Sequence, residues 1–138
     1  MPILHFVNHK EKTVFARIIG DIPTNEVISS LRKLGESSKV PDNYNILIDL
    51  RQCRKSRSYD DAQRILDAWS FASSKYSQKC VFLASETVFW GEIRMTAALA
   101  ELKGYDAHAT QSEDEACELL GITTLPSDEQ FARDGFEL

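Results

Sequence analysis

The sequence has few cysteines and no long apolar run, and each shortage excludes a class of protein. Its three cysteines, Cys53, Cys80 and Cys117, lie far apart, without a CxxC pair or a histidine at metal-ligand spacing. They predict free thiols in a reducing compartment, with neither a disulfide framework nor a metal site. No apolar stretch approaches the roughly 20 residues of a membrane-spanning helix, and the first residues lack the basic segment and cleavage site of a signal peptide. We therefore expect a cytoplasmic chain without a membrane span.

An excess of positive charge is also missing. The chain carries 16 lysines and arginines against 21 acids, a net charge of −5, which argues against a nucleic-acid binder. From Glu101 onward ten acids stand against Lys103 and Arg133. The one basic cluster is RQCRKSR at residues 51–57, which is either a solvated loop or a site for an anion or an acidic partner.

The apolar patterns that are present predict an α/β fold. Two runs rich in β-branched and aromatic residues, at 3–8 and 13–19, are typical of a hairpin. The continuous apolar runs NILIDL and CVFLAS are typical of strands buried on both faces. Helical spacing of apolar residues alternates with these runs. We expect helices near 24–34, 58–72, 91–102 and 113–120, and an edge strand at 105–110.

This order predicts a mixed sheet of four to five strands, formed by an N-terminal hairpin and then parallel β-α units, with helices packed against it. Ser58 is expected to cap the second helix, and Gly35 to end the first. Residues 1–122 are expected to form a single domain and residues 123–138 a C-terminal tail, which Phe131 and Phe136 would dock.

Phe89 and Trp90 stand side by side where a loop turns into the third helix. Large apolar residues at such a tip need burial, a ligand or a partner, and both types are enriched at interface cores. The helix itself has two apolar stripes. One stripe contains Met95, Ala98, Leu99 and Leu102, and the nearly opposite one contains Ile93, Ala97, Ala100 and Gly104. The second stripe is covered either by a neighbouring helix of the same chain or by another subunit.

A hairpin, a helix, an ILIDLR-type strand, the stretch VFWGEIRM, the stretch AALAELKGYDA and a closing EDEACELLG follow one another over residues 3–121. This series resembles the SpoIIAA-like (STAS-like) proteins of bacteria. The resemblance implies a four- or five-stranded sheet with helices against one face, frequent dimerisation, and a non-enzymatic role in binding proteins or apolar ligands. The interaction residues expected at the tip and along the second stripe are Phe89, Trp90, Ile93, Arg94, Ala97 and Ala100.

The founding members of that group carry a phosphorylated serine after the third strand, in an acidic-serine-glycine turn. In this sequence the corresponding stretch is IDLRQCRKSRSYDD, which lacks that pattern and surrounds its serines with cations. The candidates for an anion site or a phosphorylation switch are Arg54, Lys55, Ser56, Arg57 and Ser58.

Catalysis at the carboxyl ends of the parallel strands would have to use residues such as Asp49, Ser85 and Glu86. The three histidines lie in or beside the first hairpin and within the last strand, away from Ser85, and no phosphate-binding glycine loop or metal triad is present. We expect a non-enzymatic module without a cofactor. It would bind a regulatory protein partner or itself as a homodimer through the Phe89/Trp90 tip; the alternative is a small apolar or lipid-like ligand in a pocket near the same tip.

Overall fold

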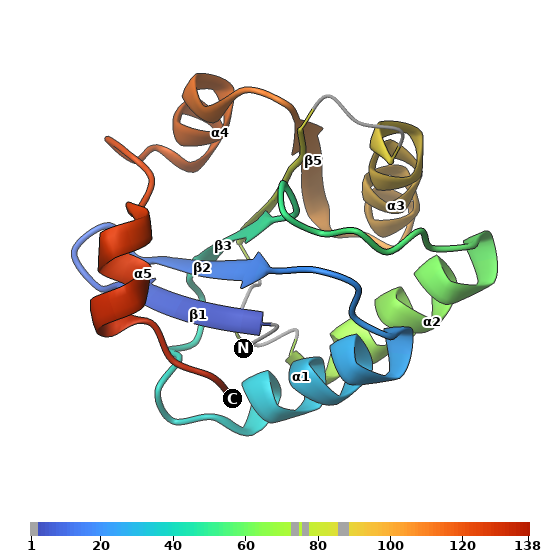
Figure 1. The fold of residues 1–138 in the computed structure, drawn as a ribbon, viewed down its shortest axis with the longest axis horizontal. Helices are drawn as coiled ribbons and strands as arrows, with labels where there is room; N and C mark the ends of the chain where they lie inside the picture. Colours follow the sequence, from blue (N-terminus) through green and yellow to red (C-terminus); the bar gives the residue numbers. More distant parts are fainter. Residues whose placement is uncertain (1–2, 73–74, 76–77, 86–88) are drawn as a thin grey trace.

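The computed structural model describes residues 3–72, 75, 78–85 and 89–138. It is an α/β fold whose five-stranded sheet has the order β1-β2-β3-β4-β5 (Figure 1). β1 pairs antiparallel with β2, and the remaining neighbours are parallel. This confirms the predicted fold class. The elements are β1 (Ile3–Asn8), β2 (Thr13–Ile18), α1 (Thr24–Glu36), β3 (Asn45–Asp49), α2 (Tyr59–Trp69), the 3-10 turn η1 (Ser70–Ala72), β4 (Lys79–Leu83), α3 (Trp90–Leu102), β5 (Asp106–Thr110), α4 (Glu113–Leu120) and α5 (Asp128–Asp134).

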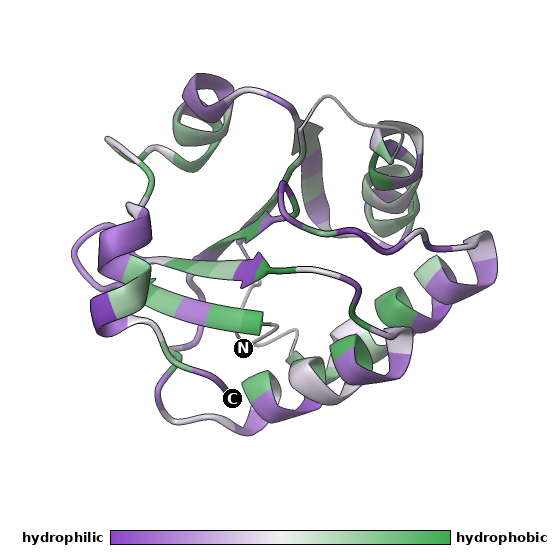
Figure 2. Cartoon of the chain, in the orientation of Figure 1, coloured by the Kyte–Doolittle hydropathy of each residue, from purple (hydrophilic) through white to green (hydrophobic). Residues whose placement is uncertain are grey.

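Helices cover both faces of the sheet. Successive strand residues point to opposite faces, so Ile46 and Ile48 lie in one core while Leu47 lies in the other. The first core is covered by α1, α2 and α3, and the second by α4 and α5. Figure 2 shows the green strands between these two sets of helices. The expectation of helices against one face only is therefore wrong, because the second face is equally apolar and must also be buried.

The C-terminal segment docks onto β1 and β2. Phe131 of α5 is buried, and Phe136 exchanges two main-chain hydrogen bonds with His5, at 2.8 and 2.9 Å. The expected role of the two phenylalanines is confirmed. None of the described helices combines the length and apolarity that a membrane span requires.

Gly35 does not end α1, which continues to Glu36. A Cβ atom at Gly35 would lie 1.9 Å from the main-chain oxygen of Phe71, so this position needs glycine for the close approach of α1 to η1. The sequence does not distinguish a glycine that ends a helix from one that allows close packing inside a helix. Here the contact with η1 identifies the second case.

Candidate functional site

An apolar cavity of about 120 Å³ lies between the sheet and the helices α1, α2 and α3. Its walls are almost entirely hydrocarbon and include Ala16, Ile18, Ile48, Leu31, Ile65 and Trp69. The wall residues come from the strands β1 to β4 and from the helices α1, α2 and α3, so the cavity belongs to the packing of the first core. His5 also lines it.

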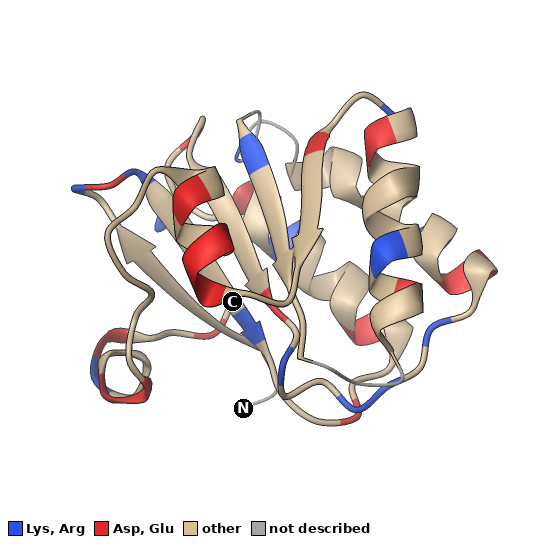
Figure 3. Cartoon of the chain, turned by 90° about the horizontal axis from the view of Figure 1, so that it is seen from above, with Lys and Arg blue, Asp and Glu red and all other residues tan. Residues whose placement is uncertain are grey.

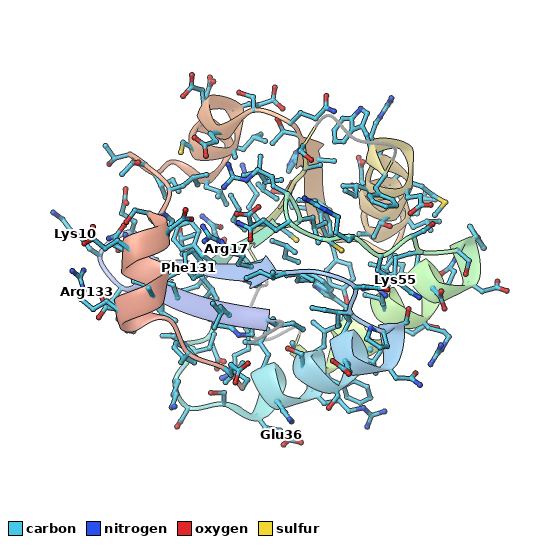
Figure 4. All side chains as sticks on the ribbon, in the orientation of Figure 1. Lys10, Arg17, Glu36, Lys55, Phe131 and Arg133 are labelled. Atoms are coloured by element: carbon cyan, nitrogen blue, oxygen red, sulfur yellow. The ribbon has the colours of Figure 1, made fainter. Side chains whose placement is uncertain are left out.

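The loop between β3 and α2 and the start of α3 line one end of this cavity, which we call the mouth because Lys55 there is exposed. Lys55, Arg57 and Glu92 are the charged residues of the lining, and Phe89 stands beside them. Figure 4 labels Lys55, which lies on the α2 side of the molecule. An apolar interior with charged groups gathered at one end is typical of a site for a small amphipathic ligand.

Glu92 ties this basic loop to α3. Its carboxylate accepts one hydrogen bond from the Ser56 hydroxyl at 2.6 Å and another from the Arg57 main-chain nitrogen at 3.0 Å. The guanidinium of Arg57 donates to the hydroxyl of Thr24, at 3.1 Å, at the beginning of α1. The loop therefore connects the first turns of α1 and α3 across the mouth.

The other end of the same loop is held by the segment that follows β2. Gly20 donates from its nitrogen to the carbonyl of Gln52 at 2.9 Å, and its own carbonyl accepts from Arg54 at 2.8 Å. Gly20 has a φ of +82°, a conformation that glycine adopts without steric cost. Arg54 is exposed, and its guanidinium donates to the carbonyls of Arg51 and Cys53. Figure 3 shows the lysines and arginines of this loop in blue.

Both serines that were candidates for a switch have structural partners. Ser58 is the N-cap of α2, and its side chain accepts from the Asp61 nitrogen at 3.1 Å, which confirms the predicted cap. The Ser56 hydroxyl is bound to Glu92. A phosphate on Ser56 would meet this carboxylate, and like charges at hydrogen-bond distance repel.

The two aromatic residues of the tip have different surroundings. Phe89 is half-buried and lines the cavity mouth. Trp90 is half-buried at the first position of α3, and the Arg94 guanidinium lies 5.9 Å from its ring centroid. Ile93, one turn after Phe89, also lines the cavity. The tip residues therefore divide between the cavity and the surface.

The small residues of the second stripe face the chain's own sheet. Ala97 and Ala100 are 6% and 3% exposed and belong to the first core. Ala98 and Leu102 of the other stripe are the exposed ones, Leu102 at 84%. The expectation that Ala97 and Ala100 contact a partner is corrected: small side chains let α3 approach β5 closely, and the chain itself covers them.

A charged cluster that the sequence reading did not identify lies on the opposite side of the sheet. Arg17 and Asp49 are 6% and 5% exposed and are register partners on β2 and β3. Arg51 donates from Nε and Nη2 to the two oxygens of Asp49, each at 2.9 Å, and this hydrogen-bonded pairing raises the pKa of Arg51. The signal in the sequence was a single arginine within the apolar run TVFARII.

Two helix starts on this side supply further acids. Asp128 of α5 accepts from Arg17 Nη1 at 2.8 Å, and Glu113 of α4 accepts from Arg51 Nη1. The ring of Phe131 packs on the Arg17 guanidinium, 4.1 Å from ring centroid to Cζ (Figure 4). A groove of about 520 Å³ runs beside these residues. We call it the charged groove.

The remaining residues considered for catalysis do not form a common site among the described residues. His9 contacts Tyr44, and His108 contacts Asp106, so neither lies at the carboxyl ends of the strands. Burial lowers the pKa of His5 to about 4, against the opposing effect of the nearby Phe136 carbonyl, and His5 Nδ1 has no hydrogen-bond partner among the described residues. Asp49 is engaged by arginine, and Glu86 lies outside the described residues.

The cysteines are free, as expected. Cys80 is buried, and desolvation raises the pKa of its thiol; the pKa of Cys117 is raised by the same cause and by neighbouring acids. In the part of the chain that the structure describes, no three histidine, cysteine or acidic residues are grouped as a metal site.

No protein-family model matches the chain, and no curated protein matches it. Its function therefore has to be inferred from the apolar cavity and the charged groove.

Proposed function

We propose that the chain is a non-enzymatic binding module of the STAS-like type, and that its ligand is a small apolar molecule carrying an anionic group. The observation that carries this proposal is the apolar cavity whose mouth holds Lys55 and Arg57. The STAS-like type rests on the sequence resemblance together with the order of one hairpin and three β-α units. Such a module needs no cofactor, and free cysteines suit a reducing compartment such as the cytoplasm.

The size of the cavity limits the apolar part of the ligand. An engineered cavity of roughly 150 Å³ lined by aliphatic and aromatic side chains stays dry and binds benzene. The cavity of about 120 Å³ therefore suits one aromatic ring or a short aliphatic chain. A complete long-chain fatty acid would need the helices α1 and α2 to separate.

The charges at the mouth favour an anionic group. The Glu92 carboxylate is already bound by Ser56 and the Arg57 nitrogen, which leaves the side chains of Lys55 and Arg57 as the charged donors nearest the opening. Lys55 lies 3.9 Å from Asp21, a long and exposed contact of little strength. A carboxylate at the mouth would offer both cations a charge-assisted hydrogen bond.

Binding of benzoate and of benzyl alcohol tests the two parts of this proposal, the apolar group and the anionic group. They share the ring and differ in the charge. Isothermal titration calorimetry should show benzoate binding at least tenfold more tightly to the wild-type protein, and Trp69 in the cavity wall gives a parallel fluorescence signal.

Lys55→Gln should reduce this preference severalfold, while Lys10→Gln, on the distant β1-β2 turn, should leave it unchanged. No binding of either compound to the folded wild-type protein would contradict the cavity as a site, and equal binding of the two would contradict the anionic group.

The non-enzymatic part of the proposal is supported by the surroundings of the strand ends. Catalysis with Asp49 would require a free carboxylate, but both of its oxygens accept from Arg51. A carboxylate held in this way is not free to contact a substrate.

A second candidate function is the expected contact with a protein partner or a second copy, and the exposed outer face of α3 favours it. Leu102 is 84% exposed and Ala98 is exposed beside it, while Trp90 is half-buried at the start of the same helix. Trp90→Asp should leave the circular dichroism spectrum unchanged and convert an oligomer to a monomer in native mass spectrometry. A wild-type monomer with no co-purifying chain would count against this candidate.

A further inference from the structure

Arg17 in the charged groove is a buried cation whose partners are incomplete. The residue is 6% exposed, and its Nε atom has no hydrogen-bond partner in the described part of the chain. Its Nη1 donates to Asp128, whose side chain is 90% exposed. A buried guanidinium is thus neutralised by a carboxylate that lies almost wholly in water.

Asp49 neutralises Arg17 only in part. Both of its oxygens already accept from Arg51 at 2.9 Å, and Oδ2 lies 3.5 Å from Arg17 Nε, beyond good hydrogen-bond geometry. Two arginines therefore share one buried carboxylate. Arg17, Asp49 and Arg51 together carry a net charge of +1, and the two arginines line the groove.

The two outer acids are weakly held. The side chain of Glu113, which pairs with Arg51, is 59% exposed, and that of Asp128 is 90% exposed. Ion pairs with a solvated partner contribute little to stability, because water competes for the charges. Both acids can therefore turn into solvent at small cost and leave the arginines open to another anion.

We infer that the charged groove binds the phosphate group of a small molecule, and that Asp128 and Glu113 occupy the phosphate position when it is absent. A phosphate dianion replaces two monoanionic carboxylates without changing the net charge at the arginines. Guanidinium groups bind phosphate through pairs of parallel hydrogen bonds, and both arginines reach the same oxygen of Asp49, so one phosphate can contact both. The groove of about 520 Å³, with Gln52 and Ser127 at its rim, leaves room for the rest of the molecule. This site is independent of the apolar cavity.

Titration of the ¹⁵N-labelled full chain with inorganic phosphate, followed by NMR chemical shifts, tests this inference. Amide signals at positions 17, 51, 52 and 127–128 should shift with phosphate and not with acetate at matched ionic strength. Asp128→Asn removes the internal competitor and should bind phosphate about two- to fivefold more tightly, the range that a solvent-exposed ion pair represents. Arg51→Gln should abolish the shifts.

Asp134→Asn is the matched control, because Asp134 belongs to the same helix, is exposed and pairs with Arg133 instead. Equal phosphate affinity of the Asp128→Asn and Asp134→Asn variants would overturn the inference, and so would equal shifts with acetate. This comparison keeps both arginines, so it decides the question even if Arg51→Gln fails to fold. A parallel titration with glycerol 1-phosphate identifies the source: tighter binding than phosphate indicates an ester, and equal binding indicates the free ion.

Discussion

The apolar cavity and the charged groove lie on opposite faces of the same two strands. Ile18 and Ile48 line the cavity, while their sequence neighbours Arg17 and Asp49 form an ion pair on the other face, where Arg17 lines the groove. Because strand residues alternate between faces, a step of one residue changes the surroundings from hydrocarbon to a pair of ions. The sheet thus separates a side with unfilled volume from a side with unbalanced charge.

Different ligands follow from this contrast. Unfilled apolar volume costs contact energy and is relieved by a molecule of matching shape, whereas unbalanced charge is relieved by a counter-ion. Figure 3 shows acidic residues on α4 and α5, on the groove side. The loop over the cavity carries Arg54, Lys55 and Arg57, and Arg17 and Arg51 line the groove. Substitutions on the cavity face should therefore act through packing, and substitutions on the groove face through charge.

The largest expected effect comes from removing the carboxylate that the two arginines share. Asp49→Asn leaves Arg17 with a solvated partner and should lower the free energy of unfolding by about 3 kcal/mol, since breaking a buried ion pair from one side is strongly destabilising. Ile48→Val, one residue away on the cavity face, removes a single methylene and should cost about 1 kcal/mol. Urea unfolding at pH 7 measures both.

Asp134→Asn should stay within about 0.5 kcal/mol of wild type, as surface substitutions do. If Asp49→Asn cost no more than Ile48→Val, the buried ion cluster would contribute little to the free energy of unfolding. The two faces would then differ in composition but not in how strongly they stabilise the fold.

The acid response of the cavity face depends on His5. Its pKa is about 4 in the folded protein and about 6.5 in an unfolded chain. The unfolded state therefore binds the proton first, and the stability of the buried neutral ring is fully present above pH 6.5 and is lost as the pH falls toward 4. The whole interval corresponds to about 3 kcal/mol.

His5→Leu removes this titration and should flatten the pH dependence of the free energy of unfolding between pH 6.5 and 4. The groove lies on the other face of the sheet and has the same residues in both proteins, so it should not contribute to the difference between them. Parallel pH profiles for wild type and His5→Leu would contradict the burial of a neutral ring.

Local features of the sequence predicted the strands, the helices and the cap at Ser58. The runs NILIDL and CVFLAS were recognisable because strands buried on both faces are apolar throughout, and Ser58 was recognisable by its place before an apolar period. Contacts between elements were not predictable in this way. The pairing of Arg17 with Asp49 requires the parallel register of β2 and β3, and the sequence contains no mark of that register.

The two stripes of α3 show the same limit. Their spacing was evident from the sequence, but which one faces the sheet depends on how closely the helix approaches β5. Ala97 and Ala100 allow a close approach, so the stripe with the smaller side chains is buried and Leu102 is left exposed. The fit of small side chains between α3 and the sheet therefore determines which stripe is buried. Hydrophobicity alone would have favoured burial of the larger residues.

The smallest expected change in stability comes from removing the helix caps on the two faces of the sheet. Ser58 caps α2 beside the cavity mouth, and Ser127 caps α5 beside the groove. Each hydroxyl satisfies one main-chain nitrogen, so alanine at either position should cost about 1 kcal/mol in urea unfolding. Their effects on binding should differ: Ser58→Ala loosens the basic loop and weakens benzoate binding, while Ser127→Ala loosens Asp128 and strengthens phosphate binding. Equal changes for both ligands in both variants would mean that the sheet does not separate the two sites.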